Sequence, residues 1–193
     1  MNPPLVLASS SPYRASLLAR LGLEFSCHAP ALDESAHAGE TPRDTALRLA
    51  GAKARAVAGD HPGALILGSD QLASLDGTPI GKPGTLERAV EQLLQASGRE
   101  LVFHTAVALL DSRSGRLQLA EVPCLVGYRT LDEPQVRRYL QREPALDCAG
   151  AARIEALGIS LVRHVRCDDP TALIGLPLIT VAAFLREAGL SLP

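Results

Sequence analysis

The chain has 193 residues, of which 47% are hydrophobic and 21% are charged, as in an ordinary soluble globular protein. Its net charge of −2 provides no broad basic surface for nucleic acid or for an anionic membrane. The sequence has no apolar stretch long enough to span a bilayer and no signal-peptide pattern at its N-terminus. We therefore expect a cytoplasmic protein that folds as a single domain, residues 1–193.

The four cysteines are spread along the chain without a C-x-x-C pair, which indicates small buried side chains that stay reduced. They are Cys27, Cys124, Cys148 and Cys167. Aromatic residues make up only 3% of the chain, so the core must be built from Leu, Val, Ile and Ala.

The first part of the chain predicts alternating strands and helices. In chain order we expect a strand at 4–8, a helix at 13–21, a strand at 23–28, an acidic loop at 29–40 and a helix from 41 to about 59. Ser11-Pro12 and Thr41-Pro42 each combine a capping hydroxyl with a proline at the first helical position.

The remaining elements continue this mixture without a repeat or a long linker. We expect buried strand residues at 64–67, a strand at 72–75, a helix at 86–96, a hairpin of 100–110 with 117–130, a helix at 132–142, a strand at 158–165 and a helix at 178–188. The pattern predicts an α/β or α+β domain.

The apolar run at 64–67 leads into Gly68-Ser69-Asp70-Gln71, which brings a carboxylate to the end of a buried strand. Proteins with α/β folds bind ligands at such strand ends. Asp76-Gly77 predicts a tight hairpin turn, which would bring Lys82 opposite Gln71 and beside Asp70. An acid and a cation at one strand end indicate metal and phosphate chemistry.

The segment Ser9-Ser10-Ser11-Pro12-Tyr13-Arg14 combines a strand end, a hydroxyl-rich loop and a helix N-terminus. Free backbone N–H groups and the helix dipole favour an anion there. Arg14 in the first turn opposes that dipole, which itself indicates a bound anion. The alternative is a plain Ser11 cap with a solvated arginine.

Lys53 lies at helical spacing on an otherwise apolar face of the helix at 41–59. It either snorkels to water or points into a cleft to hold a phosphate oxygen. The acidic pair Asp33-Glu34 in the preceding loop is either solvated or joins Asp70 as an oxygen ligand of Mg²⁺ or Mn²⁺.

The segment 148–155 is rich in small residues and ends in Arg153 and Glu155. Small side chains allow a ligand to approach closely, and a glutamate there could accept hydrogen bonds from the edge of a base. A plain surface loop is the alternative.

Together these stretches resemble the Maf family of nucleoside triphosphate pyrophosphatases along the full length. The matching motifs are Leu7-Ala8-Ser9-x-Ser11-Pro12-x-Arg14, Asp33-Glu34, Lys53, Gly68-Ser69-Asp70-Gln71, Gly81-Lys82-Pro83, Phe103-His104-Thr105-Ala106, Cys148-Ala149-Gly150 and Gly175-Leu176-Pro177-Leu178. The resemblance implies an inosine-triphosphatase-like fold, a twisted mixed β-sheet flanked by helices, with two lobes and a central cleft. It also implies a homodimer.

The resemblance further implies a house-cleaning hydrolase that cleaves a nucleotide between its α- and β-phosphates with a divalent metal cation, Mg²⁺ or Mn²⁺. Asp70 matches the proton acceptor of the family, and Glu34 matches an acidic position near the metal and the attacking water. Either carboxylate could be the base, because both could be metal ligands. The phosphate-facing positions of the family are matched by Ser9, Arg14, Lys53 and Lys82.

Three residues, Tyr13, Gln71 and Glu155, match the positions that set base preference in the family. One branch, similar to this chain, carries Ser-Asp-Gln at the central motif and acts on 7-methyl-GTP. An aromatic face attracts the cationic ring of a 7-methylated guanine by about 0.5–2 kcal/mol. Glu155 could accept from the guanine N–H edge and offset the charge.

Two other functions stay open. One is a pyrophosphatase for dTTP and UTP, the preference of another branch of the family, or for a different noncanonical nucleotide. The other is a nucleotide-binding regulator of cell division without turnover. A carboxylate at Asp70 among cations at Arg14, Lys53 and Lys82 favours an enzyme, because a protein that only binds nucleotides has no need of it.

Overall fold

A computed structural model describes residues 3–193. Its strands are β1 (Leu5–Leu7), β2 (Ser26–Cys27), β3 (Leu65–Leu75), β4 (Thr78–Ile80), β5 (Glu100–Asp111), β6 (Leu117–Tyr128) and β7 (Val162–Cys167). Its α-helices are α1 (Pro12–Ala19), α2 (Pro42–Ala56), α3 (Leu86–Ala96), α4 (Glu133–Arg142) and α5 (Leu178–Glu187). Short 3₁₀ helices lie at Ala58–Asp60, Ala149–Ala151, Leu157–Leu161 and Ala172–Ile174.

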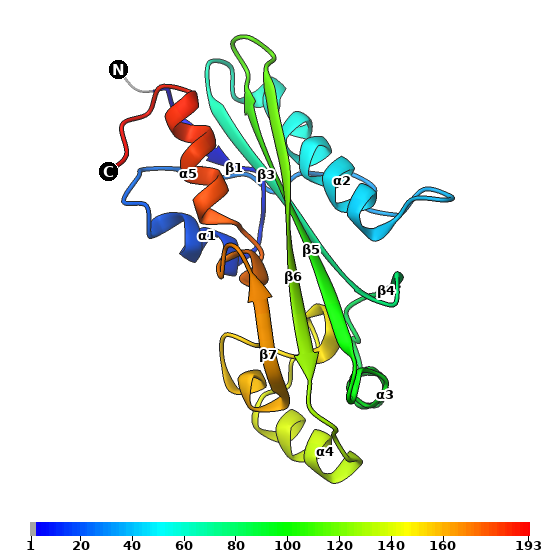
Figure 1. Ribbon diagram of the computed structural model, residues 1–193. Helices are drawn as coiled ribbons and strands as arrows, with labels where there is room; N and C mark the ends of the chain where they lie inside the picture. The colour runs from blue at the N-terminus through cyan, green and yellow to red at the C-terminus, as the bar shows by residue number, and fades with distance from the viewer. Residues whose placement is uncertain (1–2) are drawn as a thin grey trace.

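Across residues 3–193 the strands form one seven-stranded sheet in the order β2-β1-β3-β5-β6-β7, with β4 paired to β3. Strand β1 runs parallel to β2 and β3, and the other pairs are antiparallel. The long strands β3, β5 and β6 extend through an upper and a lower lobe (Figure 1). The expected mixed α/β sheet flanked by helices is therefore confirmed.

The upper lobe has three layers. Helix α2 covers one face of the sheet through small residues such as Ala50 and Ala54, which pack with Ile66. Helices α1 and α5 cover the other face through leucines such as Leu18 and Leu185 (Figure 1). These two apolar layers hold β1 and β3 between them, so the ends of both strands have fixed positions.

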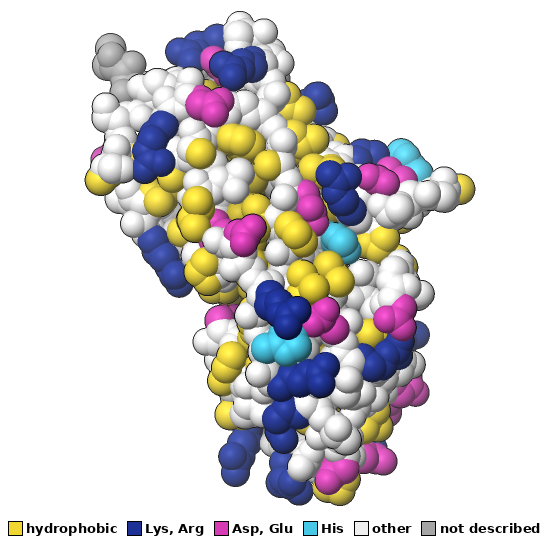
Figure 2. All heavy atoms as spheres, in the orientation of Figure 1, with side chains coloured by type: hydrophobic (Ala, Val, Ile, Leu, Met, Phe, Trp, Pro, Cys, Tyr) yellow, Lys and Arg dark blue, Asp and Glu magenta, His cyan; other side chains and the backbone are white. Residues whose placement is uncertain are grey.

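The lower lobe packs α3 and α4 around the far ends of the long strands (Figure 1). Its core contains Leu93 of α3, Phe103 and Tyr128 of the sheet, and Tyr139 of α4. On the face shown in Figure 2, basic side chains gather around β7 and α4, whereas hydrophobic side chains are more frequent above them. No helix in the described part of the chain is long and apolar enough to cross a membrane.

Three predictions about strands differ from the structure. The strands expected at 64–67 and 72–75 are one continuous strand, β3, which pairs with β5 along its whole length, so Asp70 lies within a strand and not at its end. The strand expected at 23–28 is reduced to β2, because β1 offers it only two paired positions. The strand expected at 158–165 begins with the 3₁₀ helix Leu157–Leu161, and β7 starts only where β6 is available as a partner. The N–H of Gly158 donates to the carbonyl of Arg153 at 2.9 Å and closes a turn that delays the strand.

The expectation of four unpaired cysteines is wrong. Cys124 of β6 and Cys167 of β7 form a disulfide, whereas Cys27 and Cys148 are free, and Cys27 is exposed instead of buried. The two bonded cysteines lie 43 residues apart in sequence but directly opposite each other in the antiparallel pair. Spacing along the chain could not reveal this pair, because sheet register creates it.

Candidate active site

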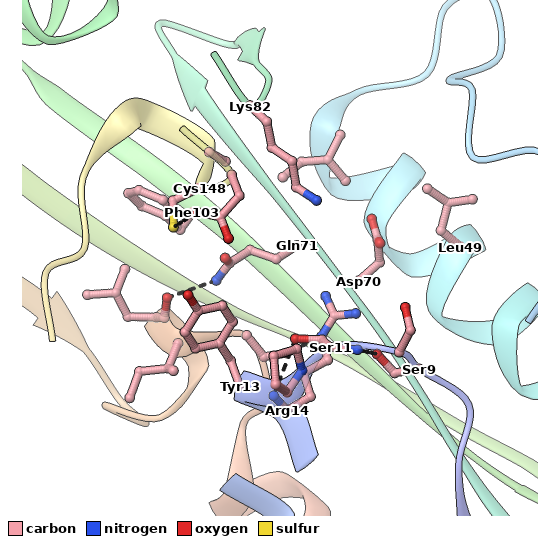
Figure 3. A pocket seen from close by; sticks show the side chains of 18 of the residues that line it. Ser9, Ser11, Tyr13, Arg14, Leu49, Asp70, Gln71, Lys82, Phe103 and Cys148 are labelled. Carbon is pink, nitrogen blue, oxygen red and sulfur yellow. Dashed lines mark hydrogen bonds between the residues drawn. The ribbon is translucent and has the colours of Figure 1, made fainter. Parts of the chain in front are cut away.

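A cavity of about 550 Å³ is lined by both lobes, a volume in the usual range for small-molecule sites. Its lining includes the end of β1, the start of α1, the middle of β3, the loop around residues 147–155 and the loop around residues 173–175. Every predicted site residue lines this cavity: Ser9, Tyr13, Arg14, Glu34, Lys53, Asp70, Gln71, Lys82 and Glu155. Figure 3 shows several of them pointing into one space. Asp33, the neighbour of Glu34, is not part of the lining.

We call the part of the cavity formed by Ser9, Arg14, Lys53 and Lys82 the phosphate end. It begins where β1 passes into α1. The Ser9 hydroxyl accepts from the N–H of Ser11 at 3.1 Å, and the Ser11 hydroxyl accepts from the N–H of Arg14 at 3.4 Å. These bonds order the loop before the helix, so the helix N-terminus faces the cavity, where it favours an anion.

Arg14 crosses the cavity floor to the C-terminal loop. Its Nε donates to the carbonyl oxygen of Gly175 at 2.9 Å, and Figure 3 shows its guanidinium directed toward Asp70. Burial lowers the pKa of Arg14, while the negative charges of Asp70 and Glu34 act in the opposite direction. Because arginine keeps its proton in proteins, the side chain is a fixed cation in this cavity.

Lys53 does not snorkel to water. Only 5% of it is exposed, and its Nζ donates to Asp70 Oδ1 at 2.6 Å and to Glu34 Oε2 at 2.9 Å. One ammonium thus joins a carboxylate from β3 to one from the loop before α2. The two carboxylates that were predicted to act together are brought to a single point.

The contact between α2 and β3 depends on Gly68. A Cβ atom at this position would lie 2.2 Å from the carbonyl oxygen of Ala50 and 2.8 Å from the nitrogen of Ala54. The absent side chain lets the helix backbone lie directly on the strand. This close approach brings Lys53 of the helix within reach of Asp70, two residues after the glycine.

The predicted hairpin after β3 is present. Ala73 of β3 is opposite Ile80 of β4, and both turn residues, Asp76 and Gly77, have positive φ angles of 50° and 79°. The ladder ends at this pair, so Lys82 lies beyond it on an exposed segment that lines the cavity. Lys82 is exposed, whereas the other predicted phosphate ligands, Ser9, Arg14 and Lys53, are buried or partly buried.

Within residues 3–193, no group of three or more His, Cys, Asp or Glu side chains could hold a metal by itself. Asp70 and Glu34 together provide two carboxylates. Mg²⁺ is commonly held by one or two carboxylates plus the phosphates of a substrate. The donor set therefore suits a cation that is shared with a bound phosphate chain.

We call the region of Tyr13, Gln71 and Glu155 the base end. The guanidinium carbon of Arg153 lies 5.2 Å from the centre of the Tyr13 ring, and its Nε lies 3.5 Å from Glu155 Oε1. Burial is the main cause that raises the pKa of Tyr13; the negative charge of Asp147 adds to it, and the positive charge of Arg153 acts in the opposite direction. One side of this region thus contains an aromatic ring, a cation and an anion in contact.

The sequence motifs included Gly175-Leu176-Pro177-Leu178 but indicated no role for the loop of residues 169–179, which supports the base end. The Asp169 carboxylate is 2% exposed and accepts from the N–H groups of Thr171 and Ile179 at 2.9 and 2.7 Å. Carbonyl groups of the same loop accept from Arg14 and Gln71. Asp169-Pro170-Thr171 does carry a turn signal, because aspartate bonds readily to backbone two residues on.

Three relatives illustrate what the chain is similar to, and each is named 7-methyl-GTP pyrophosphatase. The protein from Pseudomonas aeruginosa is 50% identical over 191 residues, covering 99% of this chain and all of its own length. The protein from Xanthomonas campestris pv. campestris (strain 8004) is 52% identical over 193 residues, covering both chains in full. The protein from Burkholderia lata is 53% identical over 189 residues, covering 96% of this chain and 90% of its own.

The model of one protein family, described as Maf-like protein, matches residues 4–188. This range contains all the residues that line the cavity and the whole of the sheet. The match therefore includes the motifs of both lobes. The chain belongs to the family of Maf-like proteins.

Proposed function

We propose that this chain hydrolyses 7-methyl-GTP to 7-methyl-GMP and diphosphate. The main support is that one cavity is lined both by the phosphate end and by the base end. A nucleoside triphosphate has the same layout, with an aromatic ring at one end and a chain of anionic phosphates at the other. Relatives about half identical over nearly their full length carry the name of this activity.

At the phosphate end, Arg14, Lys53 and Lys82 would stabilise the negative charge of the triphosphate, as phosphoryl chemistry requires. Arg14 is held by the Gly175 carbonyl through Nε only, so its two terminal nitrogens stay directed to the cavity. Ser9 would add a hydroxyl beside the α1 N-terminus.

We further propose that Asp70 and Glu34 would hold a divalent cation, Mg²⁺ or Mn²⁺. When bound, the cation supplies charge neutralisation and a more acidic water. Lys53 orients both carboxylates through its hydrogen bonds of 2.6 and 2.9 Å. Asp70 or Glu34 would take the proton from the attacking water, a contribution typically worth about 10²–10⁴-fold.

At the base end, the ring of Tyr13 offers a face to a cationic base, and Glu155 offers a negative charge. Arg153 limits both contributions, because it already contacts the ring and the carboxylate. We therefore expect a preference for 7-methyl-GTP over GTP that is set by the balance between Glu155 and Arg153.

The decisive experiment measures diphosphate release from 7-methyl-GTP, GTP, dTTP, UTP and ITP, with Mg²⁺ and with Mn²⁺. We expect the highest kcat/KM for 7-methyl-GTP. A higher value for dTTP or UTP would favour the other branch of pyrophosphatases. Nucleotide binding without release of diphosphate from any substrate would favour a regulator, and the enzyme assignment would then be wrong.

Two properties of the whole molecule are also proposals. We propose that residues 1–193 form a single domain, which is supported by β3, β5 and β6 running through both lobes (Figure 1). We also propose a homodimer, on the strength of the family resemblance. Size-exclusion chromatography with light scattering measures the mass of the particle, and a mass equal to one 20.3 kDa chain would contradict the dimer.

A further inference from the structure

The amide of Gln71 is surrounded by acceptors on one side. Its Nε2 donates to Thr105 Oγ1 at 2.8 Å, to the carbonyl oxygen of Ala172 at 2.9 Å and to that of Leu173 at 3.1 Å. Figure 3 shows the amide nitrogen turned to this side of the cavity. The contacts join β3, β5 and the C-terminal loop at one point.

Chemistry alone fixes which end of the amide faces the loop. Backbone carbonyls only accept hydrogen bonds, so the group facing Ala172 and Leu173 must be the amino group. Its two hydrogens already serve three acceptors, so no donor remains for a ligand. The carbonyl oxygen, Oε1, is left as the polar atom that Gln71 can offer to the cavity.

Thr105 completes this arrangement. It is fully buried, and its hydroxyl donates to the Ala172 carbonyl at 2.9 Å. Because its one hydrogen is used there, Thr105 can only accept from the amide of Gln71. The same hydroxyl therefore links the loop to β5 by donating to the Ala172 carbonyl, and it accepts a hydrogen bond from the Gln71 amide nitrogen.

The loop that supplies the carbonyls is itself fixed. Asp169 accepts from the N–H and the hydroxyl of Thr171 at 2.9 and 2.6 Å, and from the N–H of Ile179 at 2.7 Å. The Thr171 hydroxyl in turn accepts from the N–H of Leu178 at 2.8 Å. Rotating the Gln71 amide would place its oxygen against carbonyls that cannot move away.

We propose that Gln71 acts only as a hydrogen-bond acceptor toward the substrate, and that Thr105 is a positioning residue that maintains this orientation. The proposal rests on the proposed nucleotide pyrophosphatase function and deepens it. Glu155, the acidic residue of the base end, also offers only acceptor oxygens when ionised.

A site with two acceptors selects a base edge with two donors. Guanine presents the N1–H and the exocyclic N2 amino group side by side. Hypoxanthine lacks the amino group, and adenine and cytosine present an unprotonated ring nitrogen that would face another acceptor. We therefore infer that the donor edge of a guanine-type base is read here, in addition to any positive charge on the ring.

The first test compares 7-methyl-GTP with 7-methyl-ITP, which differ only in the N2 amino group. For the unmodified enzyme we expect kcat/KM about tenfold or more higher for 7-methyl-GTP, because the analogue leaves an acceptor unpaired. In Gln71→Met, which fills similar space without an amide, we expect this ratio to fall at least severalfold. Equal kcat/KM for the two nucleotides in the unmodified enzyme would overturn the inference.

The second test uses a matched pair at Thr105. Thr105→Val removes the hydroxyl at nearly constant volume, and Thr105→Ser keeps it. We expect the valine variant to raise KM for 7-methyl-GTP severalfold and to reduce the discrimination against 7-methyl-ITP, with a smaller change in kcat. We expect the serine variant to keep both properties.

A purely structural role for Thr105 would lower turnover of all nucleotides alike, and unchanged discrimination in Thr105→Val would remove its positioning role. Thermal unfolding of each variant separates loss of fold from loss of discrimination. These measurements also distinguish failure of the acceptor inference from failure of the proposed function. If no nucleotide releases diphosphate, the function is wrong, whereas turnover without discrimination refutes only the acceptor inference.

Discussion

The phosphate end and the base end of the cavity are built in different ways. At the phosphate end, charged side chains from α1, α2 and β3 converge, and partners such as Lys53 and Asp70 are 17 residues apart. At the base end, the Gln71 amide depends on carbonyls 101 and 102 residues away. Charge thus dominates one end, and the direction of fixed hydrogen bonds dominates the other. Changes at the first should affect all nucleotides, whereas changes at the second should alter the choice among them.

The largest effect is expected from Asp70→Asn. This change keeps the size of the side chain and an oxygen for Lys53, but it removes a negative charge and a proton acceptor. We expect kcat to fall about 10²–10⁴-fold for every nucleotide tested, because general base catalysis has this magnitude. Diphosphate release measures the loss. Near-normal turnover in a folded variant would contradict the role given to Asp70.

Lys53→Met should test whether the cation between the carboxylates is structural as well as functional. The side chains of Lys53 and Asp70 are 6% and 9% exposed, so the change leaves a buried carboxylate without its partner. Breaking such a pair costs about 3–5 kcal/mol of unfolding free energy. Urea denaturation measures the cost, and the double variant with Asp70→Asn should recover part of it. If the double variant lost as much unfolding free energy as Lys53→Met alone, the pairing of Lys53 with Asp70 would be contradicted.

Gly68→Ala should separate the packing that positions the phosphate end from its charges. The new methyl group would meet the backbone of Ala50 and Ala54, and overpacking of this kind costs about 1–3 kcal/mol. We also expect lower activity, because α2 must move away from β3 and carry Lys53 with it. Gly59→Ala is the matched control, since its methyl group would meet nothing within 4 Å. Equal stability of the two variants would show that the helix accommodates the methyl group.

The smallest expected effect is at the base end, in Arg153→Met. Removing this cation frees the Tyr13 ring and Glu155 for a cationic base. The ratio of kcat/KM for 7-methyl-GTP to that for GTP should rise about two- to fivefold, in line with a cation–π contribution of about 0.5–1 kcal/mol. Arg153→Lys, which retains the charge, should change the ratio less. A lower ratio in the methionine variant would mean that Arg153 supports the preference instead of limiting it.

The sequence predicted most of the elements because their signals are local. Ser11 and Thr41 cap α1 and α2 by accepting from the backbone N–H three residues on, and both helices begin at the proline that follows the cap. The hairpin at Asp76-Gly77 follows in the same way from two residues that tolerate positive φ. Where an element depends on a distant partner, as β2 and β7 do, its bounds could not be predicted.

At the candidate site, the residues that line the cavity could be named from motifs, but their contacts could not. Lys53 was expected either to reach water or to face a phosphate, and the structure pairs it with Glu34 and Asp70. The disulfide of Cys124 with Cys167 was missed for a related reason, since the register of β6 and β7 brings them together.

Caps and turns could be read from the sequence, because caps, turn residues and apolar periodicity act over a few residues, although Asp70, expected at a strand end, lies within β3. The direction of polar groups from remote segments depends on how those segments pack in the folded molecule. Gln71 is an ambiguous amide in the sequence, able to donate or to accept. It becomes an acceptor toward the cavity because Thr105 and a loop more than 100 residues away use both of its hydrogens.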